Sequence, residues 1–341
     1  MALKKVLVFG ASGAMGRYLI PLLAQKGFLI DAVSLDQQEY DFPNVRGISG
    51  NAKDIPFRES LLKNNYDGII DFMTYPSYEL VPFLPWIVKS TGHYIYLSSY
   101  RVYDNLEVPI RETSPRLIDS RKDVFLQNSD DYCIFKARGE NILYGMTEKN
   151  WTIVRPAITY SLLRYQLVTL ETANTVGRAQ LGKTVVLPES AFGVRSTMTW
   201  AGDAAAMIAK LLFNEQAAGE TFTVSTAENH TWGEIAEYYH DICGLKALWV
   251  DQTDFLRCAV SGFDTFPITG SWQLVYDRLF ERVIDNSKVL EATGMTQSEL
   301  RKLYDGLELE IARCPADYGM SVINNSANIR MDEYLKNSGL N

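Results

Sequence analysis

A short apolar segment that leads into three evenly spaced glycines constrains this chain more than any other feature. Residues 6–9 are apolar with no polar alternation, which is typical of a strand covered on both faces of a parallel sheet. Gly10, Gly13 and Gly16 follow at three-residue intervals. Glycine allows a tight turn close to a ligand, and the start of the next helix, expected near Ala14, presents free N–H groups to a phosphate. The segment therefore predicts a strand, a phosphate-binding turn and a helix.

The residues after this turn make a dinucleotide the expected ligand. An amphipathic helix is expected directly after the glycines, and a second strand at 29–35 ends beside Asp36. Asp36 lies twenty residues past Gly16, where an acid can accept hydrogen bonds from the hydroxyls of the adenosine ribose. The glycine spacing alone is also found at ordinary strand-to-helix turns, so the prediction depends on this context.

Strands and helices alternate through the first half of the chain. Further strands are predicted at 68–73, 94–98 and 151–154, and helices at 57–64, 79–90 and 131–146. This alternation predicts an α/β fold with a Rossmann-type doubly wound parallel sheet. We expect residues 1–158 to form the dinucleotide-binding domain, rejoined by about 196–214, and residues 159–195 and 215–341 to form a smaller C-terminal α/β substrate-binding region.

The remaining segments are less regular. Helices are predicted at 201–213, 232–243 and 298–312, the last with Ser298 as its N-cap. The other stretches share a lack of clear periodicity: a polar loop at 105–127, an aromatic stretch at 248–278 and a polar tail from Asn324.

Composition excludes several classes of protein. The 341 residues are 47% hydrophobic and 22% charged, as in globular proteins, and the net charge of −8 gives no support for a nucleic-acid partner. The start shows no secretion signal, and no window reaches the eighteen or more apolar residues that cross a membrane. Four scattered cysteines predict reduced thiols in a cytoplasmic protein and no structural metal.

One pair of side chains suggests acid–base chemistry. Tyr132 and Lys136 are four residues apart on a predicted helix, so they project from the same face. A neighbouring ammonium group favours the phenolate and lowers the pKa of a tyrosine, which brings it closer to working pH as a general acid or base. Such pairs are also common on helix surfaces, so this pair depends on the motifs around it.

Several motifs in order resemble the extended short-chain dehydrogenase/reductase family, which contains the sugar-nucleotide epimerases. The matching stretches are Gly10-Ala11-Ser12-Gly13-Ala14-Met15-Gly16, Ser98-Ser99 with Val102-Tyr103, Glu112-Thr113-Ser114-Pro115, Tyr132 with Lys136, and Arg155-Pro156. The resemblance covers roughly residues 4–244. It implies that Ser99, Tyr132 and Lys136 are catalytic, with Ser99 bonding the substrate, Tyr132 transferring a proton and Lys136 holding the nicotinamide ribose.

The resemblance also implies the cofactor and the residues that bind it. These are Gly10, Ser12, Gly13, Ala14, Met15, Gly16, Asp36, Asn51, Ala52, Lys136 and Pro156. NAD is expected rather than NADP, because Asp36 would repel a 2′-phosphate and is followed by the neutral Gln37 and Gln38. Arg195 lies near the place where the family holds the substrate diphosphate, although a solvent-facing arginine is nearly as consistent with the sequence. Arg155 itself is more consistent with a structural role.

The resemblance implies an NAD-dependent epimerase or ketoreductase that acts on a nucleotide-activated sugar through a keto intermediate. The alternative is a dinucleotide-binding sensor or scaffold that does not turn over. Tyr100 and Arg101 stand where related 4,6-dehydratases carry acids, which favours epimerisation or keto reduction and leaves Arg101 pointing away from the pocket. Asp71 replaces a histidine usual in the family and is either close to the cofactor or a strand-end carboxylate capped by amides. No membrane partner is expected, and a homodimer is left open.

Overall fold

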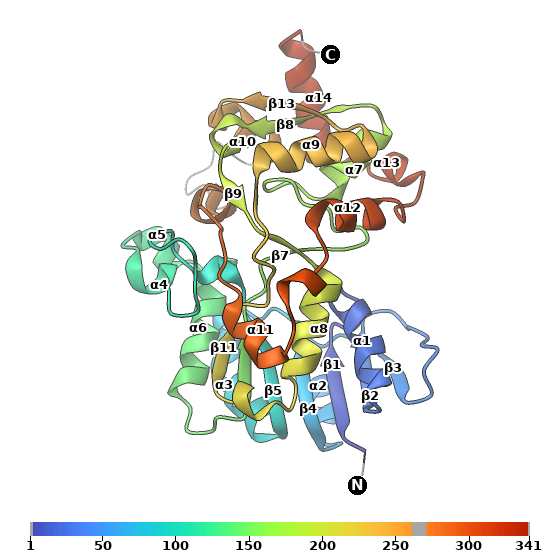
Figure 1. The fold of residues 1–341 in the computed structure, drawn as a ribbon, viewed down its shortest axis with the longest axis vertical. Helices are drawn as coiled ribbons and strands as arrows, with labels where there is room; N and C mark the ends of the chain where they lie inside the picture. Colours follow the sequence, from blue (N-terminus) through green and yellow to red (C-terminus); the bar gives the residue numbers. More distant parts are fainter. Residues whose placement is uncertain (1–2, 261–270, 340–341) are drawn as a thin grey trace.

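A seven-stranded parallel sheet forms the base of the molecule in a computed structural model that describes residues 3–260 and 271–339 (Figure 1). Across the sheet the strands are β11 (Glu220–Phe222), β6 (Trp151–Val154), β5 (Thr91–Leu97), β4 (Tyr66–Asp71), β1 (Lys5–Phe9), β2 (Leu29–Ser34) and β3 (Val45–Ser49). All six neighbouring pairs are parallel. The predicted doubly wound α/β sheet is confirmed.

Helices cover both faces of this sheet. One face carries α1 (Gly16–Gln25), α8 (Ala201–Leu211) and α11 (Ser287–Thr293), and the other carries α2 (Ile55–Leu62), α3 (Ser77–Lys89) and α6 (Tyr132–Gly145). Successive residues of β1 divide between the two cores, Val6 and Val8 packing on the α1 face and Leu7 and Phe9 on the α3 face. This is why the β1 sequence is apolar at every position from 6 to 9.

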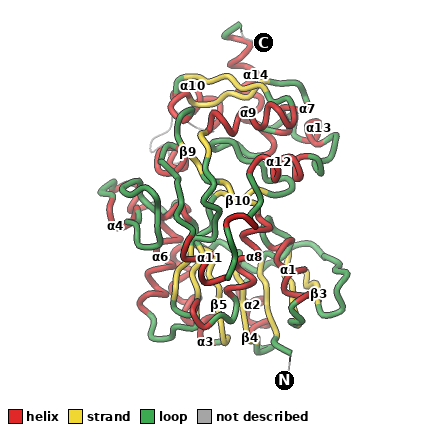
Figure 2. The backbone as a smooth tube through the Cα atoms, in the orientation of Figure 1, coloured by secondary structure: helices red, strands yellow, loops and turns green. Residues whose placement is uncertain are grey.

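The upper part of the molecule contains small sheets and short helices (Figure 2). Its strands are β7 (Ile158–Tyr160), β8 (Thr184–Pro188), β9 (Arg195–Ser196), β10 (Met198–Trp200), β12 (His230–Thr231) and β13 (Lys246–Val250). Its helices are α7 (Val176–Gln180), α9 (Trp232–Cys243), α10 (Gln252–Ala259), α12 (Leu303–Ile311), α13 (Tyr318–Ser321) and α14 (Ser326–Asn337). The parallel pair of β8 and β13 and the helix α9 contribute to a core separate from those of the large sheet.

The expected boundary between the two parts changes at two elements. The sequence assigned 215–341 to the smaller region, but β11 pairs with β6 at the edge of the large sheet, and α11 packs beside α8. β11 joins the large sheet because the backbone of Glu220, Thr221 and Phe222 aligns with β6 and pairs with its otherwise open edge. The large-sheet unit therefore recruits segments from late in the chain.

Four predictions about the less regular segments need correction. The helix expected at 298–312 starts as α12 at Leu303, because a capping box between Thr296 and Glu299 closes a separate short turn, so Ser298 is not its N-cap. The tail beyond Asn324 is helical as α14, with Met331 buried. The loop at 105–127 includes α4 (Leu117–Ser120) and the start of α5 (Val124–Asn128). The stretch at 248–278 was also expected to be irregular, but its described part contains the end of β13 and the helix α10. Residues 261–270 of this stretch lie outside the described residues.

Three general features concern the described ranges, 3–260 and 271–339. No helix there has the length and apolar character needed to cross a bilayer. All four cysteines fall in these ranges and are free thiols. Within the same ranges, no group of three or more His, Cys, Asp or Glu side chains is placed to hold a metal ion.

Helix α6 approaches β5 so closely that one position admits only glycine. A Cβ on Gly139 would lie 2.1 Å from the hydroxyl of Tyr96, whereas a Cβ on Gly145 in the same helix would meet nothing within 4 Å. We predict that Gly139→Ala lowers the free energy of unfolding by about 1–3 kcal/mol through overpacking. Gly145→Ala is the matched control and should be neutral or slightly stabilising. Urea denaturation measures both, and equal stabilities for the two variants would contradict the close packing.

Candidate active site

The glycine turn after β1 has the geometry that an anion-binding loop requires. Gly10 has a φ of +78°, and a Cβ on Gly16 would lie 2.4 Å from the carbonyl oxygen of Ala11, so both positions require glycine. Helix α1 begins at Gly16, two residues later than expected. Among the described residues, no acceptor is found for the backbone N–H groups of the turn residues Ser12, Ala14, Met15 and Gly16. Four free amides at a helix start are suited to a phosphate.

A cleft of about 410 Å³ runs along the carboxyl edge of the sheet. Because the strands are parallel, the segments that follow β1, β4, β5 and β6 meet at this edge. The cleft is lined by the turn residues Gly10, Gly13, Ala14, Met15 and Gly16, by Phe72, Thr74, Ser99, Arg101, Tyr132 and Pro156, and by Arg164, Gln166, Glu171, Gln273 and Arg278. The glycine turn and the two predicted hydroxyl residues therefore open into one cavity.

Ser99 and Tyr132 are positioned by the ends of two different elements. Ser99 follows β5 and caps the short helix η1 (Tyr100–Val102), its Oγ accepting a hydrogen bond of 3.2 Å from the backbone N–H of Arg101. Tyr132 is the first residue of α6, directly after the N-cap Asp131. Both side chains line the cleft, and a hydrogen bond with Ser99 acts to lower the pKa of Tyr132. The structure thus brings two of the three expected catalytic residues together.

The charge environment of Tyr132 differs from the expectation. Burial raises the pKa of Tyr132 above the usual phenol value, and Arg101, Arg164 and the Ser99 hydroxyl act against this rise. The sequence predicted a lowered pKa caused by Lys136. That prediction is wrong in direction, because desolvation outweighs the charges, and the cations that act on the phenol are arginines.

Lys136 lies beneath the cleft rather than on its surface. It is 1% exposed, and its Nζ donates to the carbonyl oxygens of Leu97 at 2.5 Å and Met73 at 3.3 Å. Burial lowers the pKa of Lys136 to about 8, while Asp71 and Glu140 act in the opposite direction. In this conformation the ammonium group donates its hydrogen bonds to carbonyl groups at the end of β5 and just after β4. It would have to turn toward the cleft to contact a ribose.

Asp71 is a buried carboxylate that does not line the cleft. Its oxygens accept hydrogen bonds from the hydroxyls of Tyr94 and Tyr75, each at 3.1 Å, and from the backbone N–H of Met73 at 2.9 Å. Burial raises the pKa of Asp71, and the Met73 amide and Lys136 oppose that rise. Of the two interpretations drawn from the sequence, the strand-end carboxylate capped by local donors agrees with this geometry.

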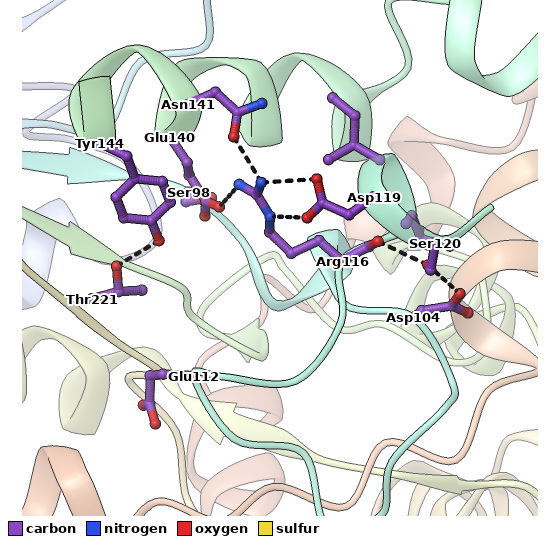
Figure 3. Close-up of polar contacts among 12 residues, drawn as sticks. Ser98, Asp104, Glu112, Arg116, Asp119, Ser120, Glu140, Asn141, Tyr144 and Thr221 are labelled. Carbon is purple, nitrogen blue, oxygen red and sulfur yellow. Dashed lines mark hydrogen bonds and ion pairs between the residues drawn. The ribbon is translucent and has the colours of Figure 1, made fainter. Parts of the chain in front are cut away.

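A buried ion pair joins the elements that carry the site. Glu140 of α6 is 0% exposed and accepts two hydrogen bonds of 2.7 Å from the Nε and Nη2 of Arg155, which follows β6. Glu140 also accepts from the Ser98 hydroxyl at 2.5 Å and from Arg116 at 3.0 Å (Figure 3). Burial alone would raise the pKa of Glu140, but Arg155, Ser98 and Arg116 hold it below its usual value.

The Arg116 side chain extends this cluster to the loop at 105–127. Figure 3 shows Arg116 between Glu140, Asn141 and Asp119, with hydrogen bonds to all three. Arg155 also donates to the carbonyl oxygen of Glu112 at 3.1 Å. Arg155 therefore has the structural role favoured by the sequence, while the next residue, Pro156, reaches the cleft.

The other expected cofactor residues lie along the same edge but outside the cleft lining. Asp36 follows β2 and is exposed, and Asn51 follows β3, its Oδ1 accepting from the backbone N–H of Lys53 at 3.0 Å. Ala52 is buried against the core beside β1. Since β1, β2 and β3 are neighbouring parallel strands, these residues continue the line of the glycine turn.

Arg195 is not part of the cleft lining. Its Nε forms a 2.6 Å ion pair with Glu281, and the side chain is 46% exposed, so the solvent-facing alternative describes it. The reason is that β9 pairs with β12, which turns this arginine toward Glu281.

Sequence reasoning missed two further cations that line the cleft with Arg101, namely Arg164 and Arg278. Arg164 lies in a tight turn closed by two hydrogen bonds with Ser161, and Leu163 in that turn has a φ of +59°. A second turn nearby places Val168 at a φ of +53°, with its carbonyl bonded by Arg278 at 2.7 Å. Strained non-glycine residues are enriched at functional sites. No local sequence pattern predicts a leucine or valine in the left-handed backbone conformation. These two turns could therefore not be predicted from the sequence.

The chain resembles known proteins at the level of its fold. No protein-family model matches the sequence, and no curated protein matches it. Solved structures do resemble the fold. An epimerase from Methanothermobacter thermautotrophicus is 13% identical with a TM-score of 0.71, and the match covers 95% of each chain. The UDP-glucose 4-epimerase of Thermus thermophilus, solved with NAD, is 17% identical with a TM-score of 0.63, over 90% of this chain and 98% of that one.

A third solved structure extends the comparison. The UDP-glucuronic acid 4-epimerase of Bacillus cereus, solved with UDP-glucuronic acid and NAD, is 14% identical with a TM-score of 0.65, over 93% of this chain and 99% of that one. At these low identities the similarity shows the fold. The chain has the fold of these epimerases over at least 90% of its length.

Proposed function

We propose that the protein is an NAD-dependent epimerase or ketoreductase that acts on a nucleotide-activated sugar through a keto intermediate. The observation that carries the proposal is the single cleft that joins a glycine turn with free amides to Ser99 and Tyr132. The fold supports it, since similar solved structures are epimerases with bound NAD. A fold hosts many functions, so the residues in the cleft decide the assignment.

The residues present fit a dinucleotide. The free amides of Ser12, Ala14, Met15 and Gly16 would hold its pyrophosphate, and the exposed carboxylate of Asp36 would accept from its adenosine ribose. Asn51 and Ala52 would flank the adenine, and Pro156 and Lys136 the nicotinamide side. When bound, NAD supplies a hydride acceptor. Because Asp36 would repel a 2′-phosphate, NAD is proposed over NADP.

Proton transfer would fall to Tyr132, with Ser99 orienting the substrate. The Oγ of Ser99 accepts from the Arg101 amide, and its own proton can donate to Tyr132 or, once substrate is bound, to a substrate oxygen. In the oxidation direction the Tyr132 phenolate takes the proton of a sugar hydroxyl. The same residue returns that proton when the keto group is reduced.

On the substrate side, Arg164 takes the place first expected for Arg195. Its Nε donates to the carbonyl oxygen of Thr159 at 3.1 Å, and no partner of its terminal nitrogens is found in the described ranges. A guanidinium with free donors that lines the cleft suits a phosphate or carboxylate group. Glu171 is the one carboxylate among the described residues that line the cleft. The scarcity of acids there favours epimerisation or keto reduction over 4,6-dehydration.

One observation favours a second candidate, a dinucleotide-binding sensor without turnover. Lys136 is directed at strand carbonyls, and burial raises the pKa of Tyr132, as a protein that only binds would tolerate. The facing pair of Ser99 and Tyr132 has no purpose in a sensor, which is why the enzyme is preferred. The cytoplasmic location and the homodimer raised by the sequence stay predictions.

We predict that the protein binds NADH more tightly than NADPH. A charge-assisted hydrogen bond is worth about 1.5–3 kcal/mol, so Asp36→Ala should lose roughly ten-fold or more in NADH affinity. Asp41→Ala is the matched control, because Asp41 is an exposed acid in the same loop and removes the same charge. Isothermal titration calorimetry measures the affinities. Tighter NADPH binding, or equal losses in the two variants, would rule out this cofactor assignment.

We predict that incubation with NAD and a panel of UDP-, GDP-, CDP- and dTDP-hexoses yields an epimer or a reduced product and no dehydrated one. Tyr132→Phe should bind NADH normally and lose about 10²–10⁴-fold in turnover, with Ser99→Ala losing less. Tyr78→Phe is the control, since Tyr78 is exposed and outside the cleft. Mass spectrometry identifies the products. A product lighter by one water would overturn the reaction type and make Glu171 the acid to test.

A further inference from the structure

Arg101 occupies a position that the sequence did not anticipate. It lies in η1, two residues after Ser99, and its guanidinium stacks 5.3 Å from the centroid of the Tyr132 ring. The side chain is 12% exposed and lines the cleft. The expectation that Arg101 points away from the pocket is therefore wrong.

The surroundings of Arg101 fix its guanidinium in place. Its Nη2 pairs with Asp131 at 3.3 Å and its Nε lies 3.6 Å from Asp277. Asp131 is also the N-cap of α6 and accepts from the backbone N–H of Cys133 at 3.1 Å. Asp277 is fully buried and pairs with two further arginines, Arg278 and Arg282. The guanidinium is thus anchored to the helix start that carries Tyr132.

The backbone of Arg101 acts on the other hydroxyl of the site. Its N–H donates to the Ser99 Oγ at 3.2 Å. This bond occupies a lone pair of Ser99 and leaves the Ser99 proton available to the cleft. One residue therefore orients Ser99 through its main chain and contacts Tyr132 through its side chain.

We propose that Arg101, rather than Lys136, supplies the positive charge that assists proton transfer at Tyr132, and that it is a positioning residue for the proposed reaction. The proposal rests on the proposed function. In the oxidation direction the sugar O–H proton passes to the Tyr132 phenolate, the C–H hydrogen leaves with its electron pair to the dinucleotide, and a ketone remains. A fixed cation beside the ring stabilises the phenolate that accepts the proton.

The geometry of Lys136 explains why Arg101, and not Lys136, would supply the positive charge at Tyr132. Its Nζ lies 5.6 Å from the Tyr132 ring centroid, but its protons are directed to the carbonyls of Leu97 and Met73. Burial lowers the pKa of Lys136 to about 8, so its charge is lost in weakly alkaline solution. A guanidinium stays charged at any working pH.

The described groups around the Tyr132 phenol act on its pKa in opposite directions. Burial raises the pKa of Tyr132, and Arg101 is the strongest opposing charge, followed by Arg164 from the 161–164 turn. Burial acts to lower the pKa of Arg101, but the carboxylates of Asp277 and Asp131 outweigh it and hold that pKa above its usual value. Phe135 packs edge-on against the ring at 5.3 Å and carries no charge.

The test compares Arg101→Gln with Arg101→Lys. With NAD and the reacting nucleotide sugar, the rate at which the sugar is oxidised to the keto intermediate, measured in a single turnover, rises as the pH passes the pKa of Tyr132. An opposite charge within about 4–6 Å lowers a pKa by about 1–3 units, so loss of Arg101 should move this rise to higher pH by about 1 unit or more. Arg101→Lys keeps a charge without the planar stack and should show a smaller shift. A rise at the wild-type pH in Arg101→Gln overturns the proposal.

Arg121→Gln is the matched control. Arg121 also stacks on an aromatic ring, 5.5 Å from the centroid of Phe280, and pairs with the buried carboxylate of Asp104, but it does not line the cleft. It tests whether loss of any such arginine disturbs the profile. A shift in Arg121→Gln as large as that in Arg101→Gln would overturn the proposal.

A second measurement needs no substrate, so it separates the role of Arg101 from the proposed function. Fluorotyrosine placed at position 132 reports ionisation of the phenol directly by fluorine NMR. We expect its titration midpoint to rise in Arg101→Gln and to change less in Lys136→Met. An unchanged midpoint in Arg101→Gln, or a larger rise in Lys136→Met, overturns the role of Arg101. If no nucleotide sugar is turned over while the midpoint rises in Arg101→Gln, the proposed function fails and the charge assignment holds.

Discussion

The buried ion pair between Glu140 and Arg155 is the interaction on which the site depends. Glu140 comes from the helix that begins at Tyr132, and Arg155 follows the strand that ends beside the cleft. The Ser98 hydroxyl joins the same carboxylate from the end of β5. Three elements that could shift independently are thereby held at one point. Such a pair is costly to bury, but removing one partner costs about 3–5 kcal/mol, because the other charge is left unpaired.

This arrangement determines what the edge of the sheet can do. With α6 held against β5 and β6, Tyr132 faces Ser99, and Pro156 enters the same cleft as the glycine turn. A second buried carboxylate, Asp277, pairs with Arg101, Arg278 and Arg282. Glu140 and Asp277 therefore have structural roles, because their carboxylates are paired with buried arginines. Of the arginines around these two acids, Arg101 and Arg278 also line the cleft.

Local patterns were sufficient where the physics is local. The apolar run at 6–9 and the glycines after it predicted β1 and the turn, and the helix at 232–243 ends at Gly244, whose φ is +72°. Strand β6 matches its predicted range because it is buried at every position. β3 was missed since its residues are only partly buried and carry no clear period. The start of α12 was misplaced because Ser298, expected as its N-cap, lies in a separate short turn closed by the capping box of Thr296 and Glu299.

The sequence predicted which hydroxyl residues form the candidate site, but not where the charged side chains lie or how they change the pKa of Tyr132. The motifs predicted Ser99 and Tyr132, and both line the cleft. The position of Lys136 depends on the carbonyls at the ends of two strands, and that of Arg101 on Asp131 and Asp277, which is far away in the sequence. The net pKa of a buried phenol depends on desolvation, which no spacing of residues reveals. These properties arise only when the chain is folded.

Arg155→Leu measures the dependence on the ion pair most directly, through its unfolding by urea and its affinity for NADH. We expect the free energy of unfolding to fall by about 3–5 kcal/mol and NADH binding to weaken with it, since Glu140 loses its main partner. The comparison variant is Arg111→Leu, which breaks the exposed pair of Arg111 with Asp285 and should cost less than about 1 kcal/mol. If Arg155→Leu is as stable as Arg111→Leu and binds NADH like the wild type, the account of this site is contradicted.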